Sequence, residues 1–208
     1  MPLTRLLLVF VLPLYVADQV SKWWIVLTFP EPPPGYTSVP EMITVVEGFF
    51  NIVRVHNQGV AFGFGNGTLW APPVFLLVQV VALVAIIVLY RRGVFATPLL
   101  RVAAGLLLTG IVGNMTDRLL QGFFLEAWNG AGFWTRLSKG YVVDFLDFTL
   151  PLVNYRWPAF NVADSCICVA AFFLILSTFR EEQVSKEASG GEETGSGEGI
   201  GDVRESAD

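Results

Sequence analysis

Four long runs of apolar residues divide the chain, and each is long enough to cross a lipid bilayer as a helix, which takes about 20 residues. They lie at about 6–29, 72–90, 97–120 and 158–179. The second run contains no charged residue and is the clearest of the four. The pattern predicts an all-α membrane protein whose four transmembrane helices form one domain over residues 1–179.

The first run could instead be a secretory signal peptide, because Arg5 precedes an apolar block. Apolar residues resume after Lys22, however, and no small-x-small cleavage site separates the two blocks. We therefore interpret residues 6–29 as a span of the working protein.

Two long polar connections have patterns of their own. Residues 44–55 are rich in β-branched and aromatic side chains and are followed by a turn at 57–59, which predicts a small β-rich segment at the membrane surface. Within the stretch 119–141, residues 123–139 contain five aromatic residues and few charges, a composition typical of a segment lying in the membrane interface.

Basic residues predict the orientation of the spans. The short connection 91–101 holds three arginines, whereas the longer one at 30–71 holds only Arg54. Since short connections rich in Lys and Arg stay in the cytoplasm, we expect this connection and both termini to be cytoplasmic. The β-rich segment is then extracytoplasmic.

The composition supports a membrane protein, with 53% hydrophobic and 15% charged residues, against about 25% charged in soluble domains. The net charge of −5 comes from a Gly- and Glu-rich tail at 180–208, which we expect to be acidic, disordered and cytoplasmic. No basic stripe suggests a nucleic-acid partner. A single histidine excludes a histidine-rich metal site within one chain, and we expect no metal.

Polar side chains within or beside the spans require an explanation, because a charge at mid-helix costs about 2.5–3.5 kcal/mol on insertion scales. They form four groups: Asp18 with Lys22; Asn114 with Asp117 and Arg118; Asp144 with Asp147; and Asn161 with Asp164. All except the Asp18 group are expected near the outer face. Two carboxyl groups that converge there would share a proton and could activate a water. Spacing alone leaves open whether Asp117, Asp144 or Asp147 partners Asp164.

Several of these residues also have simpler interpretations. Asp18 and Lys22 are equally consistent with a structural ion pair, and Arg118 with a counter-ion for Asp117. His56 is interpreted as a loop residue, and no Gly-x-Ser-x-Gly elbow is present for a serine nucleophile. The main alternative function is a small ion- or proton-conducting membrane transporter.

Five ordered motifs, at 18–22, 57–62, 113–118, 142–145 and 160–164, resemble those of the lipoprotein signal peptidases, or signal peptidase II, a bacterial family of intramembrane aspartyl proteases. The resemblance implies that Asp144 and Asp164 are the catalytic dyad. It also implies a substrate-binding or supporting role for eight residues: Asp18, Lys22, Asn57, Gly59, Asn114, Asp117, Arg118 and Asn161.

The resemblance further implies an endopeptidase that removes the signal peptide of prolipoproteins by cutting before a diacylglyceryl-modified cysteine. Its partners would be this lipid-modified precursor and membrane lipid, it would use no cofactor, and it would lie in the bacterial cytoplasmic (inner) membrane. The chain departs from the family pattern at 119–141, where the link between two motifs is longer than usual.

Overall fold

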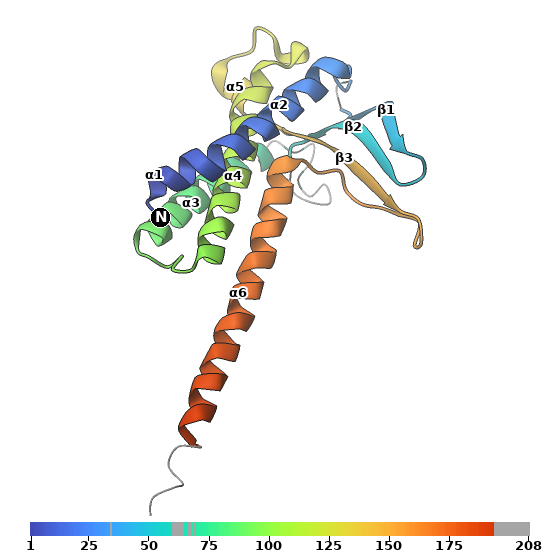
Figure 1. Ribbon diagram of the computed structural model, residues 1–208. Coiled ribbons are helices and arrows are strands. Elements are labelled where there is room, and N and C mark those ends of the chain that lie inside the picture. Colours follow the sequence, from blue (N-terminus) through green and yellow to red (C-terminus); the bar gives the residue numbers. More distant parts are fainter. Residues whose placement is uncertain (34, 60–64, 66–67, 69, 194–208) are drawn as a thin grey trace, which may run out of the picture.

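The computed structural model describes residues 1–33, 35–59, 65, 68 and 70–193, and four helical stretches within them are long and apolar enough to cross a membrane. The first combines α1 (Leu3–Leu6), a π-helical turn (Leu7–Val11) and α2 (Leu12–Thr28). The others are α3 (Ala71–Arg91), α4 (Pro98–Leu120) and α6 (Val162–Glu193). The four spans expected from the hydropathy pattern are therefore present (Figure 1).

The fourth helix departs from its expected bounds at both ends. It begins at Val162 rather than near residue 158, because Pro158 lies in an extended segment and Asn161 caps the first turn. It continues to Glu193, so the tail is helical, not disordered, between 180 and 193. The sequence there contains five Glu, a good helix former, and an existing helix can be extended without a new nucleation cost. Residues 194–208 lie outside the described residues.

A four-stranded antiparallel sheet accompanies the helices, so the all-α class is wrong in the strict sense. Its strands are β1 (Ser38–Val46), β2 (Phe50–Asn57), β3 (Val142–Leu150) and β4 (Tyr155–Arg156), in that spatial order. The hairpin β1–β2 confirms the predicted β-rich segment, and β3 joins it from the other long connection. The sheet projects from the helices beside α2 and the start of α6 (Figure 1).

Helix α4 packs against α2, α3 and α6. Small residues on α4 allow the neighbouring helices to approach it closely. A Cβ added at Gly110 would lie 2.4 Å from Cγ1 of Ile167, and one at Gly113 would lie 2.6 Å from a carboxylate oxygen of Asp18. Beneath the sheet, Ile25 of α2 belongs to an apolar cluster with Tyr141 and other residues next to β3. The strand carrying Asp144 and the helix carrying Asp164 are thus both anchored to the helix bundle.

The segment 119–141, which we call the insert, is folded onto the C-terminal end of α4. It contains two 3-10 turns (Gln121–Phe123 and Glu126–Trp128) and the short helix α5 (Phe133–Leu137). A Cβ at Gly140 would lie 1.9 Å from the carbonyl oxygen of Arg118, so this approach requires glycine. The Arg136 guanidinium also donates to the carbonyl of Phe123, which ties the two ends of the insert together.

Candidate active site

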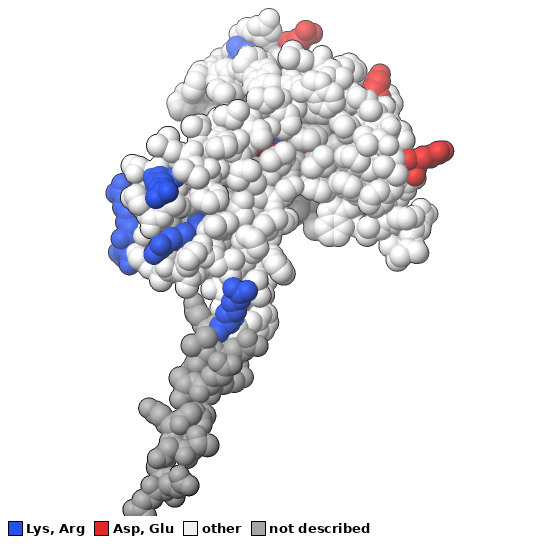
Figure 2. All heavy atoms as spheres, viewed as in Figure 1, with Lys and Arg blue, Asp and Glu red and all other residues white. Residues whose placement is uncertain are grey.

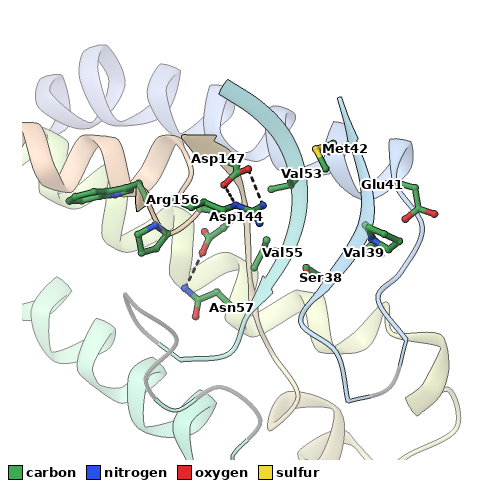
Figure 3. A pocket seen from close by; sticks show the side chains of 14 residues that line it. Ser38, Val39, Glu41, Met42, Val53, Val55, Asn57, Asp144, Asp147 and Arg156 are labelled. Carbon is green, nitrogen blue, oxygen red and sulfur yellow. Dashed lines mark hydrogen bonds and ion pairs between the residues drawn. The ribbon is translucent and has the colours of Figure 1, made fainter. Parts of the chain in front are cut away.

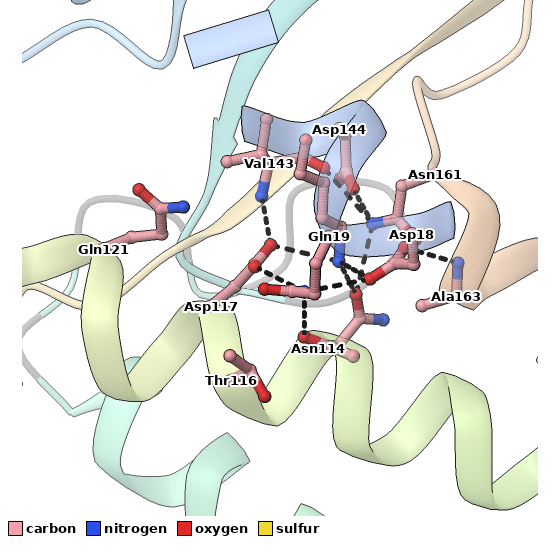
Figure 4. A network of polar contacts seen from close by, with 12 residues as sticks. Asp18, Gln19, Asn114, Thr116, Asp117, Gln121, Val143, Asp144, Asn161 and Ala163 are labelled. Carbon is pink, nitrogen blue, oxygen red and sulfur yellow. Dashed lines mark hydrogen bonds and ion pairs between the residues drawn. The ribbon is translucent and has the colours of Figure 1, made fainter. Parts of the chain in front are cut away.

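A buried polar network joins α2, α4, β3 and the start of α6 (Figure 4). The ammonium group of Lys22 lies at its centre. Its Nζ lies 2.9 Å from Asp18 Oδ2, 3.0 Å from Asp117 Oδ2 and 2.9 Å from Asn114 Oδ1. A lysine has three N–H donors, and these three oxygens can accept all of them. The Asp18 pair, the one group not expected near the outer face, therefore lies in the same cluster as Asn114 and Asp117.

The two carboxylates that hold Lys22 also bind backbone amides of other elements. Asp18 Oδ1 accepts from the Ala163 amide at 2.8 Å, in the first turn of α6. Asp117 Oδ2 accepts from the Val143 amide at 3.0 Å, on β3. Gln19 donates to both carboxylates, a role that its polarity alone did not reveal. The network therefore fixes the positions of the residues that follow, Asp144 and Asp164.

Asn161 contacts both of those carboxyl groups. Its side-chain Nδ2 donates to Asp144 Oδ1 at 2.7 Å, and its backbone amide donates to Asp164 Oδ2 at 3.3 Å. In return the Asp164 amide donates to Asn161 Oδ1 at 2.9 Å, which completes a reciprocal cap on α6. Asn57 Nδ2 donates to Asp144 Oδ2 at 2.9 Å, and Asn114 Nδ2 donates to Asp164 Oδ1 at 2.7 Å. Three asparagines thus orient the two carboxyl groups.

The electrostatic environment disfavours a negative charge on Asp144. Burial raises the pKa of Asp144 well above its usual range, and the neighbouring Asp164 carboxylate adds to this effect. The hydrogen bond from Asn57 and the charge of Lys22 lower the pKa of Asp144, but they do not compensate for burial. Asp144 is therefore suited to keep a proton near neutral pH.

The other two candidate carboxylates have partners of their own. Asp117 pairs with Lys22, as described above. Asp147 forms a two-point ion pair with Arg156, with Nε to Oδ1 at 2.7 Å and Nη2 to Oδ2 at 2.9 Å (Figure 3). The spacing of the motifs left Asp117, Asp144 and Asp147 as possible partners of Asp164. Among these three, Asp144 is the one that Asn161 links to Asp164.

A cavity of about 410 Å³ lies on the sheet face next to Asp144 (Figure 3). β1, β2 and β3 line it, together with the segment 156–159 that leads to α6. Asn57 and Asp144 both belong to its wall, so one of the two carboxyl groups lies next to this cavity.

Arg118 forms no direct ion pair with Asp117 in the described part of the chain, contrary to the simpler interpretation, although the two opposite charges attract each other. Its guanidinium donates to the carbonyl of Gln58 at 3.0 Å and to the carbonyl of Gly59. The Gly59 amide in turn donates to Asn57 Oδ1 at 3.1 Å. Arg118 therefore holds the turn that positions Asn57 against Asp144. The rest of this motif, at 60–62, lies outside the described residues.

His56 is a strand residue of β2 and not a loop residue. Its ring stacks on Tyr141 with 3.7 Å between the centroids, and its Nε2 accepts from Arg54 Nε at 2.9 Å. Burial, with a contribution from Arg54, lowers the pKa of His56 to about 3. The imidazole is therefore neutral at physiological pH and supports the sheet. Among the described residues, no group of three or more His, Cys, Asp or Glu side chains could hold a metal ion.

The fold and the site together define a multi-pass membrane protein in which Asn161 links the buried carboxyl group of Asp144 to the half-buried one of Asp164. Two carboxyl groups held together in this way are typical of aspartic proteases. A family model described as signal peptidase (SPase) II matches residues 10–180. The chain therefore belongs to the signal peptidase II family.

Curated relatives and solved structures agree with this assignment. The lipoprotein signal peptidase of Oleidesulfovibrio alaskensis is 38% identical over 79% of this chain and 88% of its own length. That of Geobacter sulfurreducens is 36% identical over 88% of this chain and 96% of its own. A solved structure described as a bacterial membrane enzyme has a TM-score of 0.66 at 22% identity, covering 97% of this chain and 96% of the other, and supports the fold.

Proposed function

We propose that Asp144 and Asp164 are the catalytic pair of this protein. Membership of the signal peptidase II family gives the activity that they serve: the chain is an aspartic endopeptidase that removes signal peptides from prolipoproteins. The observation that carries the assignment is Asn161, which hydrogen-bonds both carboxyl groups at once. The transporter alternative is not favoured, because the family match covers all four spans.

In the proposed mechanism Asp144 begins protonated and Asp164 ionised. The raised pKa of Asp144 supports the first state. Asp164 lies in the first turn of α6, where the positive end of the helix dipole favours a negative charge. Asp164 takes a proton from a water, whose oxygen attacks the scissile carbonyl carbon while Asp144 protonates the carbonyl oxygen. The carbon–nitrogen bond then breaks as the departing amine takes the proton from Asp164 and Asp144 recovers its own.

The proposed substrate is a precursor whose cysteine carries a diacylglyceryl group, cut just before that cysteine. Its acyl chains would remain in the bilayer, so the scissile amide would be held at the membrane surface and less orientational freedom would be lost on binding. The cavity beside Asp144 offers room for the polypeptide.

The proposed location is the bacterial cytoplasmic membrane, with both termini in the cytoplasm and the site near the outer face. The charge distribution supports this orientation. Lys and Arg gather at the end of the molecule with the N-terminus and the α3–α4 turn, away from the acidic residues on the sheet side (Figure 2). This turn and its flanks contain Arg91, Arg92 and Arg101, in keeping with the positive-inside tendency.

The test compares purified wild-type protein with Asp144→Asn and Asp164→Asn on a lipid-modified precursor. We expect each variant to lose about 10²–10⁴-fold in cleavage rate, the usual range for a general acid or base. Asp147→Asn is the matched control, because Asp147 lines the same cavity but pairs with Arg156, and it should keep most of the activity. The wild type should show a bell-shaped pH profile. Near-normal cleavage by either dyad variant, or a flat profile from about pH 4 to 9, would refute the assignment.

A further inference from the structure

Another cavity, of about 340 Å³, lies between α3 and the insert, and none of its described lining residues is among those assigned to catalysis. One wall consists of four residues of α3 between Pro73 and Val80, and the other of Trp134, Leu137 and Ser138 at α5. We call this cavity the α3–α5 groove. Along α3 it extends over two turns, about 10 Å at 1.5 Å per residue.

The surroundings of the groove are those of a lipid-facing surface. In the most apolar window of α3 no residue is buried inside the protein, and Leu77 in the groove is 63% exposed. On the insert, Phe133 and Trp134 are 59% and 78% exposed. Such rings are favourable at the boundary between acyl chains and headgroups, and this is the level at which α3 begins. The groove is thus continuous with the surface that α3 presents to the bilayer.

The lining of the groove matches a hydrocarbon ligand. Of the seven described residues that line it, six are apolar or aromatic, and the one hydroxyl, Ser138 Oγ, already donates to the Thr135 carbonyl at 2.8 Å. The described lining is therefore predominantly apolar. The wall is also preformed, because the contact of Gly140 with Arg118 and the bond from Arg136 to the Phe123 carbonyl fix the insert on α4.

We propose that the α3–α5 groove binds one acyl chain of a bilayer phospholipid and that this chain anchors the insert in the outer leaflet. The proposal gives the insert a ligand of its own, separate from the lipid-modified precursor. It concerns only the insert and α3, and it does not depend on which residues catalyse peptide cleavage.

The test uses the full chain in vesicles that contain a phospholipid with a photoreactive diazirine in one acyl chain and no precursor. After illumination, mass spectrometry should find labels on both walls, at 73–80 and at 134–138. Val80→Trp fills the groove and should lower the labelling of 134–138 several-fold. Val81→Trp is the matched control, because Val81 is 60% exposed on α3 but does not line the groove, and it should leave this labelling unchanged.

Two results would overturn the proposal. Absence of label at 134–138 would mean that no phospholipid chain enters the groove. Equal labelling in the Val80→Trp and Val81→Trp variants would mean that α5 contacts only bulk lipid. Because the readout is a covalent label and not cleavage, an error in the catalytic assignment would leave these outcomes unaffected.

Discussion

Replacing Lys22 with methionine removes the cation that pairs with the buried carboxylates of Asp18 and Asp117. Asp18 is 0% exposed and Asp117 1%, and each lies within 3.0 Å of the Lys22 ammonium. Removing one partner of a buried ion pair costs about 3–5 kcal/mol, because the other charge is left uncompensated. In a chain of this size such a loss corresponds to a decrease in Tm of about 6–20 °C.

The assay is thermal unfolding of the detergent-solubilised protein at pH 7, with Lys139→Met as the control. Lys139 is half-buried, and its ammonium lies over the Trp128 ring at 4.6 Å. Its replacement by methionine should lower the free energy of unfolding by about 1 kcal/mol or less. Adding Asp117→Asn to Lys22→Met should restore part of the stability, because it neutralises one stranded carboxylate. The electrostatic explanation of this cluster is wrong if the double variant loses the sum of the stability losses of Lys22→Met and Asp117→Asn. It is also wrong if Lys22→Met unfolds at the same temperature as wild type.

Two further predictions concern the sheet and the insert. The pKa of His56 falls from its ordinary 6.5 to about 3 on folding, so the unfolded chain binds more protons between these pH values. Stability should therefore decline as the pH falls from about 6.5 toward 3. The Tm of His56→Gln should depend less on pH in this window, and a slope equal to that of wild type would contradict the buried, neutral state of His56. Gly140→Ala should lower the unfolding free energy by about 1–3 kcal/mol, since its Cβ would collide with the Arg118 carbonyl. Gly132→Ala is the control, because its Cβ would meet no atom within 4 Å, and it should change the unfolding free energy by less than about 0.5 kcal/mol in the same denaturation experiment. Equal losses for Gly140→Ala and Gly132→Ala would show that the insert is not tightly packed.

Local patterns in the sequence were sufficient for the elements but not for all their ends. The apolar runs predict the spans, and the β-branched residues of 44–55 predict the β1–β2 hairpin. The end of α6 could not be predicted in the same way, because the tail composition that suggests disorder also favours helix once a helix already exists. The pairing of β3 with β2 places Asp144 opposite Val55, 89 positions away in the chain, and no local pattern carries that information.

The polar groups of the site stood out because each is costly in a membrane, but their pairing depends on geometry. Arg118 follows Asp117 directly, which made an ion pair between them plausible. Adjacent residues on a helix point about 100° apart, however, and the two side chains go to different partners. Lys22 reaches Asp117 from another helix, 95 residues earlier, and only the packing of α2 on α4 brings them together.

The hydrogen bond from the Ala163 amide to Asp18 connects the first and last membrane segments over a separation of 145 residues. During synthesis Asp18 and Lys22 enter the bilayer long before α4 and α6 exist, so the nascent chain carries a lone acid–base pair in its first segment. The remaining partners arrive only with the later helices. With Asp164 as the proposed second catalytic carboxyl group, we expect proteolytic activity to begin only when the final segment has been inserted.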